Sequence, residues 1–540
     1  MKKLQKIKIT NFRSIKEEIE INFPSNKPVI LIGENNSGKS NILKAIDLLF
    51  GDTFPKYINF DDHDYFGRNP NNNIKIKIQA YVDGFSCEGF LLEKEKDKEV
   101  TFNSFDENKN SYVKNELRQG LYTVLINSQQ TLDYQLSYTS KYTLLSKLTK
   151  AFHEKLVSEK ERENKLKRLY SEIINTFLEV EEFSHFRKNM SSLSGEFMEN
   201  MNYSLDIDFS AYDPSNYFKN LRVLPFFDNQ GLAFDELGAG QLQILALSFA
   251  HAYAKFFKNE SGLVLLIDEP EAHLHPLAQK WLAKSLFKLA NDGLQIVITT
   301  HSPYFIDLNF FESFYIVKKV QNQTIVRNNT IEDLVDFCKK TGAQKSDEKT
   351  IIPFYHKSAT SNILKGFFAN KIILVEGMTE ELALPIYLEK VGIDVLKEGI
   401  DVISVNGKGE LAKWWRLFSL FKIPCYIIFD NDSNDDNQKT KRIDALKSIG
   451  IQDDEIKQLI ITDAWNIDDK FCVFGKDFEE TLRKTFNKYK DYEDEAKKVL
   501  GDSKPLIARE VALKIVNDTN INEENWSQFK KLTEKIKNLK

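Results

Sequence analysis

Short apolar runs alternate with amphipathic segments along most of the chain. Val29–Ile32 is such a run, and it ends at Gly33 before residues 41–50, whose apolar side chains recur at helical spacing. Leu263–Ile267 and Leu294–Ile298 are two further runs with a helical pattern between them. Continuous apolar strands that alternate with helices are typical of a parallel sheet covered on both faces. This pattern predicts an α/β domain.

Two other segments change the picture of this domain. Residues 74–83 alternate apolar and polar side chains, which predicts a half-exposed antiparallel strand. Residues 141–205 carry leucine and phenylalanine at three- and four-residue spacing around a charged stretch, which predicts long inserted amphipathic helices. Two interpretations stay open: these helices cover the sheet, or they form a protruding dimerisation arm.

A second α/β pattern begins after a polar stretch. Residues 341–365 are polar, and we expect an irregular linker there. Beyond it, the predicted strands Ile372–Val375, Asp401–Val405 and Cys425–Phe429 are separated by helical patterns, which indicates a Rossmann-like domain over residues 366–540.

Composition excludes several classes of protein. The 540 residues are 42% hydrophobic and 28% charged, which is ordinary for a globular chain. The net charge of −5 does not exclude nucleic acid, because only a local patch must be basic. The N-terminus lacks the apolar core of a signal peptide, and no apolar run approaches the ~20 residues of a membrane span. We therefore expect a cytoplasmic protein without a membrane partner.

The loop after the first apolar run has the composition of a phosphate-binding loop. Residues 33–40 match G-x-x-x-x-G-K-[ST] between a predicted strand and a predicted helix. Backbone N–H groups of such a loop surround phosphates, Lys39 would reach the β- and γ-phosphates, and Ser40 would bind Mg²⁺. The predicted nucleotide-binding residues of the loop are Gly33, Asn35, Asn36, Gly38, Lys39 and Ser40.

Three polar residues at later strand ends complete the predicted nucleotide site. Asp268 would bind the Mg²⁺ ion, and Glu269 would polarise the attacking water. His301 follows the next strand and would contact the γ-phosphate. A separate loop with Gly238, Gly240 and Gln241 precedes an apolar helix but lacks lysine, so we expect it to close on a nucleotide held by another protomer.

These motifs resemble those of ABC-type ATPases, specifically the SMC/RecF/OLD branch. Residues 9–14 are similar to the opening strand of that branch, and residues 237–241 are similar to its signature loop. The usual signature has serine where this chain has Gly238, so a phosphate-contacting hydroxyl is missing. The resemblance therefore implies nucleotide binding as a conformational control rather than rapid hydrolysis.

Acidic residues gather at predicted strand ends of the second domain. Glu376 follows one strand, Glu380 lies one helical turn later, and Asp430 and Asp432 follow another strand. The carboxyl ends of parallel strands meet at one edge of a sheet, so we expect these acids to converge. A set of oxygen ligands suits Mg²⁺ or Mn²⁺.

This second constellation resembles a TOPRIM domain. Val375–Gly377 and Asp430–Asp432 are similar to its Glu-Gly and Asp-x-Asp motifs, and Val405–Gly409 is similar to its middle strand and turn. An ABC-type ATPase followed by TOPRIM is the architecture of the OLD family. The implied domains are an ATPase in two parts, a helical insertion, a linker and a TOPRIM nuclease domain, at residues 1–140 and 206–340, 141–205, 341–365 and 366–540.

The OLD resemblance also implies the chemistry. It implies a two-metal DNA endonuclease in anti-phage defence, with Asp477 and Glu479 as further metal ligands and Lys504 stabilising the transition state. It implies ATP and Mg²⁺ or Mn²⁺ as cofactors, a homodimer or higher oligomer, and a defence partner such as a helicase-like protein or a retron reverse transcriptase with its DNA. Two alternatives stay open: a topoisomerase- or primase-like enzyme, and a non-nucleolytic DNA-binding ATPase similar to RecF.

Overall fold

The computed structural model divides the chain into two compact units. One unit comprises residues 1–125 and 259–540, and the other comprises residues 126–258. The second unit contains the predicted insertion, residues 141–205, and is longer at both ends. The structure describes residues 2–51, 53–68, 74–106, 109–118, 120–127, 145–146, 156, 158–197, 226–227, 230–231, 236–238, 241, 244–245, 248–249, 252, 262–432 and 435–539.

An antiparallel sheet forms one layer of the N-terminal part of the first unit. Its strand order is β2-β1-β4-β5-β6-β7. Burial alternates along β4, which confirms the predicted half-exposed antiparallel strand. The strands are β1 (Lys3–Thr10), β2 (Ile19–Asn22), β4 (Lys75–Asp83), β5 (Gly89–Glu95), β6 (Thr101–Asp106) and β7 (Lys109–Tyr112), and the short helix α2 (Asn115–Arg118) follows them.

A second sheet carries the phosphate-binding loop. Its order is β14-β13-β3-β12-β11-β8, and β13, β3, β12 and β11 run parallel. The parallel arrangement confirms the prediction from the apolar sequences of β3, β11 and β12, whereas β13 is not among the predicted strands. Helix α1 (Lys39–Phe50) follows β3, and α9 (Pro276–Asn291) connects β11 to β12. The strands are β3 (Val29–Ile32), β8 (Leu121–Asn127), β11 (Gly262–Asp268), β12 (Gln295–Thr300), β13 (Phe314–Val320) and β14 (Gln323–Arg327).

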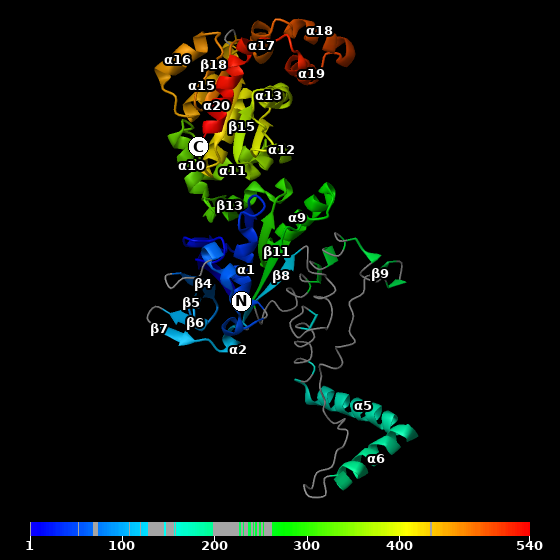
Figure 1. Ribbon diagram of the computed structural model, residues 1–540. Coiled ribbons are helices and arrows are strands. Elements are labelled where there is room, and N and C mark those ends of the chain that lie inside the picture. The colour runs from blue at the N-terminus through cyan, green and yellow to red at the C-terminus, as the bar shows by residue number, and fades with distance from the viewer. Residues whose placement is uncertain are drawn as a thin grey trace. The chain divides into compact units, whose positions relative to one another are not determined.

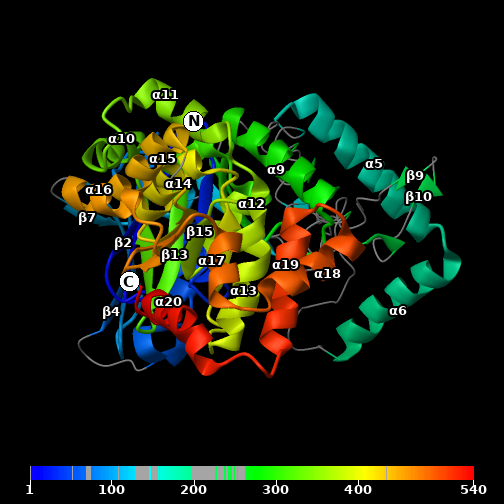
Figure 2. The same ribbon diagram turned by 90° about the horizontal axis from the view of Figure 1, so that it is seen from above.

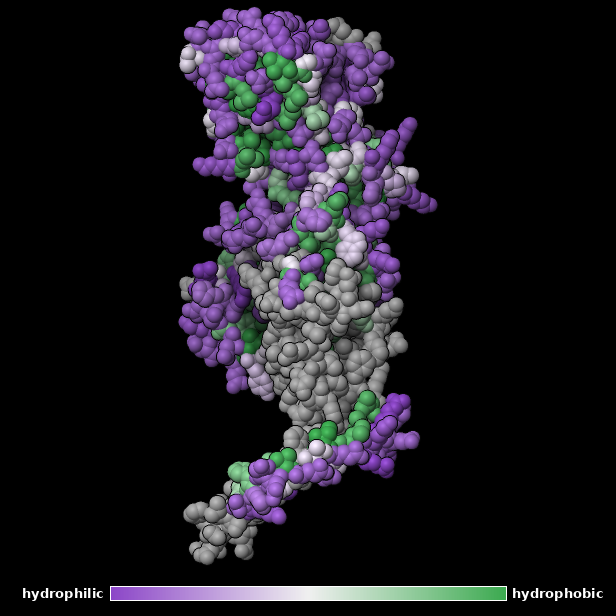
Figure 3. Space-filling view, turned by 90° about the vertical axis from the view of Figure 1, so that its right-hand side faces the viewer, coloured by the Kyte–Doolittle hydropathy of each residue, from purple (hydrophilic) through white to green (hydrophobic). Residues whose placement is uncertain are grey.

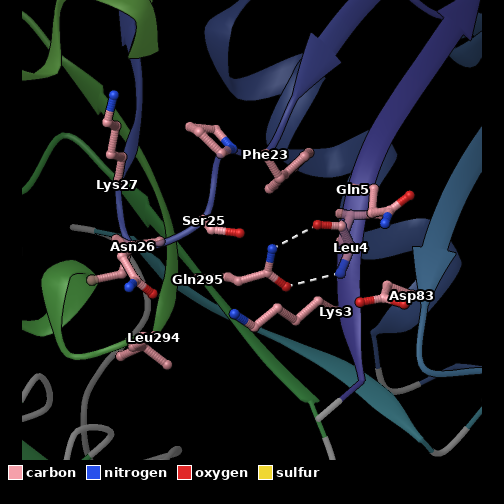
Figure 4. A pocket seen from close by; sticks show the side chains of 13 residues that line it. Lys3, Leu4, Gln5, Phe23, Ser25, Asn26, Lys27, Asp83, Leu294 and Gln295 are labelled. Carbon is pink, nitrogen blue, oxygen red and sulfur yellow. Dashed lines mark hydrogen bonds between the residues drawn. The ribbon is translucent and has the colours of Figure 1, made fainter.

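One glutamine ties the two sheets together. The side chain of Gln295 on β12 accepts a hydrogen bond from the backbone N–H of Leu4 at 2.8 Å and donates one to its carbonyl at 2.6 Å (Figure 4). The cavity beside this pair has a volume of only about 50 Å³, which suits water rather than a nucleotide. We therefore assign the pair a structural role.

The expectation that residues 341–365 lack regular secondary structure is wrong. Residues 341–365 contain α11 (Glu348–His356) and α12 (Ser361–Leu364), after α10 (Ile331–Lys340). These helices form because Ile351, Tyr355 and Ile363 bury their side chains, and the Tyr355 hydroxyl donates to the carbonyl of Lys413 at 2.9 Å. The apolar residues are too few and too widely separated by polar ones for the pattern to stand out in the sequence.

A third sheet follows, with the order β16-β15-β17-β19-β18. Its first four strands are parallel, and Figure 2 shows α13 and α14 on either side of β15. The strands are β15 (Lys371–Val375), β16 (Ile400–Ser404), β17 (Cys425–Asp430), β18 (Asn466–Ile467) and β19 (Phe471–Phe474). The helices are α13 (Met378–Lys390), α14 (Lys408–Leu420), α15 (Asp436–Ser448), α16 (Asp453–Ile461), α17 (Phe478–Thr485), α18 (Tyr489–Leu500), α19 (Lys504–Asn517) and α20 (Ser527–Asn538).

The second unit is described mainly by two long helices. Figure 1 shows α5 (Lys160–Leu178) and α6 (Glu181–Phe197) joined at a sharp bend, and β9 (Phe226–Phe227) pairs with β10 (Gln230–Gly231). Apolar side chains on the helices are exposed and lie among hydrophilic ones (Figure 3). Within the described residues, no helix combines the length and apolar character that a membrane crossing requires.

Candidate functional site

The phosphate-binding loop is shaped by two glycines. A Cβ atom on Gly33 would lie 2.1 Å from the carbonyl oxygen of Val317, so the loop must pass against β13 without a side chain. Gly38 has a φ of 109°, which is a left-handed conformation that favours glycine. Asn35 and Asn36 lie exposed on the turn between these glycines. The loop therefore delivers the chain into α1 with Lys39 as its first residue.

Lys39 is buried and forms no ion pair in the described part of the chain. Its Nζ atom donates to the carbonyls of Gly33 and Glu34 at 2.9 and 3.0 Å, and it lies 2.7 Å from Nε2 of His301. Burial lowers the pKa of the Lys39 ammonium to about 8, although Glu269 and nearby acids oppose this shift. The ammonium is thus held by neutral acceptors, which an anionic phosphate would outcompete.

The strand-end residues gather beside this lysine. The Ser40 hydroxyl donates to Oδ1 of Asp268 at 3.2 Å, and Oε1 of Glu269 lies 3.1 Å from Nε2 of His301. Burial and the positive charge of Lys39 lower the pKa of His301, which favours the neutral imidazole, although Glu269 opposes this shift. The Thr299 hydroxyl joins these two pairs, because it donates to Asp268 and accepts from the backbone N–H of Glu269. Four of the residues predicted for nucleotide and Mg²⁺ therefore form one contact network with Lys39.

Glu271 is a member of this network that the sequence analysis does not assign. Its Oε1 atom accepts from the Thr300 hydroxyl at 3.0 Å and from the backbone N–H of His301. Burial raises the pKa of its carboxyl, and its Oε2 atom is buried without a hydrogen-bond partner. Glu271 therefore fixes the backbone that carries His301. Glu271 belongs to the unusual sequence after Asp268, which marks this region in the sequence. Its contact with the backbone of His301 joins segments 30 positions apart, so no local pattern predicts it.

The predicted signature loop lies in the other unit. The side chain of Gln241 accepts from the backbone N–H of Gly238 at 3.0 Å, and the backbone N–H of Gln241 donates to the Gly238 carbonyl. Gly240 lies outside the described residues. The role of this loop at the nucleotide of another protomer stays a prediction.

The acidic residues at the TOPRIM strand ends meet around a lysine. The Nζ atom of Lys408 lies 2.6 Å from Oδ2 of Asp432 and 3.4 Å from Oε2 of Glu376. Asp430 is the last residue of β17, and its Oδ1 atom is buried without a hydrogen-bond partner. Acids at the ends of β15 and β17 thus reach a common centre, and the lysine is the first residue of α14, which follows β16.

Glu380 and Glu479 add negative charge near Glu376 and Asp430. Glu380 is 4% exposed and accepts from the backbone N–H of Gly377 at 3.0 Å. Burial raises its pKa to about 7, and Glu376 and Glu479 add to this shift. Burial also raises the pKa of Asp430 well above its ordinary value, with further contributions from the neighbouring acids. Burial and the neighbouring acids together cause these shifts, and a bound divalent ion would oppose both effects.

The remaining predicted residues lie in other settings. Asp477 caps α17 by accepting from the backbone N–H of Glu480 at 2.6 Å. Lys504 is exposed at the start of α19, and no ion pair joins it to an acid of the described residues. Their roles at a metal stay predictions.

Asn431 was visible in the sequence only as the middle residue of Asp-x-Asp. It is 1% exposed, and its amide donates to the carbonyl of Thr462 at 2.8 Å. Its own carbonyl accepts from the buried Arg442. Asp432 next to it has a φ of 44°, which is unusual outside glycine. Asn431 therefore anchors the turn that presents Asp432.

The donor set fits divalent cations, although Lys408 fills the centre. Asp430 Oδ1 is buried without a hydrogen-bond partner, Glu376 Oε2 lies 3.4 Å from the Lys408 ammonium, and carboxylate oxygens are the ligands that Mg²⁺ and Mn²⁺ prefer. Within the described ranges, no three His, Cys, Asp or Glu side chains are arranged as a ready metal cage. Because an ammonium separates Glu376 from Asp432, we expect a cation to require rearrangement of Lys408.

The nucleotide site and the TOPRIM sheet are in contact. The His301 ring lies 6.5 Å from the Phe368 ring, and Lys318 on β13 donates to the carbonyl of Ala369 at 3.3 Å. A cavity of about 410 Å³ is lined by residues 33–37 of the phosphate-binding loop and by Phe368 and Lys422. Phe368 and Ala369 lie just before β15, whose other end carries Glu376.

The fold and both sites define a P-loop ATPase joined to a TOPRIM domain. A family profile described as an AAA ATPase domain matches residues 1–180 and 93–306, together more than half of the chain. A second profile, the TOPRIM domain of proteins like Overcoming lysogenization defect (OLD), matches residues 367–432. The chain therefore belongs to the AAA ATPase domain family with an OLD-like TOPRIM domain, which confirms the resemblance predicted from its motifs.

Three curated relatives are similar to the chain. An OLD nuclease from Thermus scotoductus is 24% identical, and the match covers 79% of this chain and 82% of that protein. The Old nuclease of Escherichia phage P2 is 30% identical over 32% of this chain and 28% of its own length. The endonuclease GajA of Bacillus cereus is 23% identical over 59% of this chain and 51% of its own length.

Proposed function

We propose that this protein is a divalent-metal-dependent DNA endonuclease of the OLD family, controlled by nucleotide at its ATPase domain. The observation that carries the proposal is the convergence of Glu376, Asp430 and Asp432 at one edge of the TOPRIM sheet. The names of the relatives, two OLD nucleases and an endonuclease, support the same activity. Acids that repel one another at a strand end are best explained by a cationic ligand.

The proposed chemistry divides roles among the residues. Two Mg²⁺ or Mn²⁺ ions would activate water and stabilise the leaving oxygen of a DNA phosphodiester. Glu376, Asp430 and Asp432 would hold the ions, with Glu380, Glu479 and Asp477 completing the set. Lys504 would stabilise charge on the phosphate.

Control by ATP is supported by the contacts between the two sites. Lys39 and Ser40 would bind ATP and its Mg²⁺ ion with Asp268, and Glu269 would orient water for slow hydrolysis. His301 contacts Lys39 and also lies against Phe368 at the base of β15. Occupation of the phosphate-binding loop would therefore alter contacts at the strand that presents Glu376.

Homodimerisation is supported by two features of the second unit. The loop at Gly238 and Gln241 has no lysine of its own and suits a nucleotide held by another protomer. Leu169, Ile173 and Phe186 on α5 and α6 are 47–57% exposed, as expected of an apolar arm that pairs with a second copy. We further propose a cytoplasmic role in anti-phage defence, together with a helicase-like protein or a retron reverse transcriptase and its DNA.

A plasmid assay tests the nuclease proposal. Supercoiled DNA is incubated with the full chain and Mg²⁺ or Mn²⁺, and nicked and linear products are measured. We expect Glu376→Gln and Asp430→Asn to lower cleavage at least ~100-fold, because both change metal ligands. Asp454→Asn, a change at an acid whose side chain is 95% exposed on α16, is the matched control.

Other outcomes separate the alternatives. Undiminished cleavage by the Glu376→Gln variant would refute the site. A change in linking number without strand breaks would indicate a topoisomerase-like enzyme. DNA binding without any change in the plasmid would indicate a non-nucleolytic ATPase.

A further inference from the structure

Lys408 is placed at the acidic centre by its backbone. Gly407 has a φ of 129°, and its N–H donates to the carbonyl of Glu376 at 2.8 Å. This bond fixes the start of α14 against the end of β15, so the next side chain points into the acidic centre. The side chain of Lys408 is 0% exposed, whereas those of Glu376 and Asp432 are 24% and 36% exposed.

The ammonium of Lys408 balances only part of the negative charge. It contacts Asp432 at 2.6 Å and Glu376 at 3.4 Å, and Asp430 keeps a buried oxygen without a partner. One positive charge therefore lies among several acids, and the side chain that carries it is fully buried. Buried charges are costly unless they are paired, so this ammonium stabilises the arrangement of acids when no other cation is present.

The ammonium also occupies the place of a metal ion. A Mg²⁺ ion lies about 2.0–2.1 Å from its ligand oxygens, so an ion bound by the Glu376 and Asp432 oxygens that now contact Lys408 would have to replace Nζ beside them. The Nζ atom and an ion cannot occupy one position, and an ion placed beside the ammonium would compete with it for the same carboxylate oxygens. Metal binding and the present position of Lys408 therefore exclude one another.

We propose that Lys408 is an internal counter-ion that holds the metal-free site together and is displaced when a divalent cation binds Glu376 and Asp432. This inference rests on the proposed metal site but assigns a separate role to a residue outside the ligand set. Lys408 lowers the affinity for the cation, because the ion must first break the contacts with Asp432 and Glu376. The same contacts raise the stability of the metal-free protein.

The first experiment measures Mn²⁺ binding to the nucleotide-free full chain by isothermal titration calorimetry. Lys408→Met keeps the length of the side chain and removes its charge. We expect Mn²⁺ to bind this variant roughly tenfold more tightly, and we expect the metal-free variant to melt at a lower temperature. Lys413→Met is the matched control, because Lys413 is a buried lysine of the same helix that pairs with Glu410 instead. Its Mn²⁺ affinity should not change.

The outcomes distinguish this inference from the proposed function. If Glu376→Gln and the wild type bind Mn²⁺ alike, the proposed metal site is wrong. If Glu376→Gln loses binding while Lys408→Met binds as the wild type does or more weakly, the metal site stands and the counter-ion role of Lys408 is refuted.

A second measurement needs no variant. The wild-type protein is treated with an amine-acetylating reagent with and without Mn²⁺, and modification of Lys408 is quantified by mass spectrometry. We expect little reaction without metal, because the side chain is fully buried, and a several-fold increase with Mn²⁺. Equal modification in both states would overturn the displacement of Lys408.

Discussion

The nucleotide site and the acidic site are built alike around a buried lysine. Lys39 begins α1 after Gly38, and Lys408 begins α14 after Gly407, and both glycines have positive φ angles. In each case a parallel strand ends, a loop turns through the glycine, and the lysine is aimed back over the strand ends. The local chain geometry is therefore similar at both sites.

The partners of the two lysines differ, and this difference sets the charge of the ligand. Lys39 donates to the neutral carbonyls of Gly33 and Glu34. The positive charge of its ammonium is therefore available to attract an incoming phosphate. Lys408 already contacts the carboxylates of Glu376 and Asp432, so an incoming cation competes with it. One lysine is expected to recruit its ligand, whereas the other is expected to oppose it.

The largest effect is expected for Lys39→Met, which tests the recruiting role of this lysine. The variant should bind ATP about 30- to 150-fold more weakly, because a charge-assisted contact to phosphate contributes ~2–3 kcal/mol. Titration with a fluorescent ATP analogue measures the effect. Lys44→Met on the same helix, where the side chain is exposed beside Asp47, should bind as the wild type does. Equal affinity in all three proteins would contradict a recruiting role for Lys39.

A third cluster shows how an acid behaves when it has enough cations. Glu493 is 7% exposed and contacts Arg483, Lys490 and Lys497. Burial alone would raise its pKa, but hydrogen bonds from Arg483 and Lys497 outweigh this effect and lower the pKa to about 2. We expect its stabilising contribution to be complete above about pH 4.5, the ordinary value, and to be lost as the pH falls toward 2.

Glu493→Gln should therefore lower the unfolding free energy by ~1–3 kcal/mol at pH 7, and by less as the pH falls below 4.5. Urea unfolding of wild type and variant at several pH values measures the difference. A difference that stays constant down to pH 3 would show that charge pairing is not its source. Mn²⁺ should not stabilise this cluster, since its acid already has three cationic partners.

A smaller effect is expected at the turn that presents Asp432. Asn431→Ala removes the amide that donates to the carbonyl of Thr462, and should lower the unfolding free energy by ~1–2 kcal/mol. Calorimetric melting measures this loss, with the exposed Asn437→Ala on α15 as control. Because the turn would loosen, Mn²⁺ affinity should fall together with stability. Unchanged affinity in a destabilised variant would mean that Asn431 supports the fold alone.

The smallest predicted effect concerns communication between the sites. Phe368→Ala removes the ring beside His301 but no proposed ligand. ATP binding and basal cleavage should stay close to wild type, while the effect of ATP on the cleavage rate should shrink about fivefold, or ~1 kcal/mol of coupling. Plasmid cleavage with and without ATP measures it. An undiminished ATP effect would exclude this contact from the coupling.

The sequence predicts the two sheets that carry the sites because both are marked by local patterns. Val29–Ile32 and Lys371–Val375 are continuous apolar strands, and each is followed by polar residues whose spacing indicates chemistry. Because parallel strands end at one edge of a sheet, the sequence alone predicts that Glu376 lies near Asp430.

Other features depend on contacts that no local pattern contains. Lys408 belongs to a stretch whose resemblance to TOPRIM is visible, but its pairing with Asp432 bridges two strand ends. Glu271 and Asn431 act on residues about 30 positions away, so spacing does not reveal them. The helices within residues 341–365 depend on burial of Ile351 and Tyr355 against distant elements, which overrides their polar surroundings.

Strand β15 has a thermodynamic consequence for the whole chain. Its first residues follow Phe368 and Ala369, which contact the ATPase part, and its last residue precedes Glu376. If bound ATP changes the affinity for Mn²⁺ through this strand, Mn²⁺ must change the affinity for ATP by the same factor. The occupancy of each site would then depend on the concentrations of both ATP and Mn²⁺.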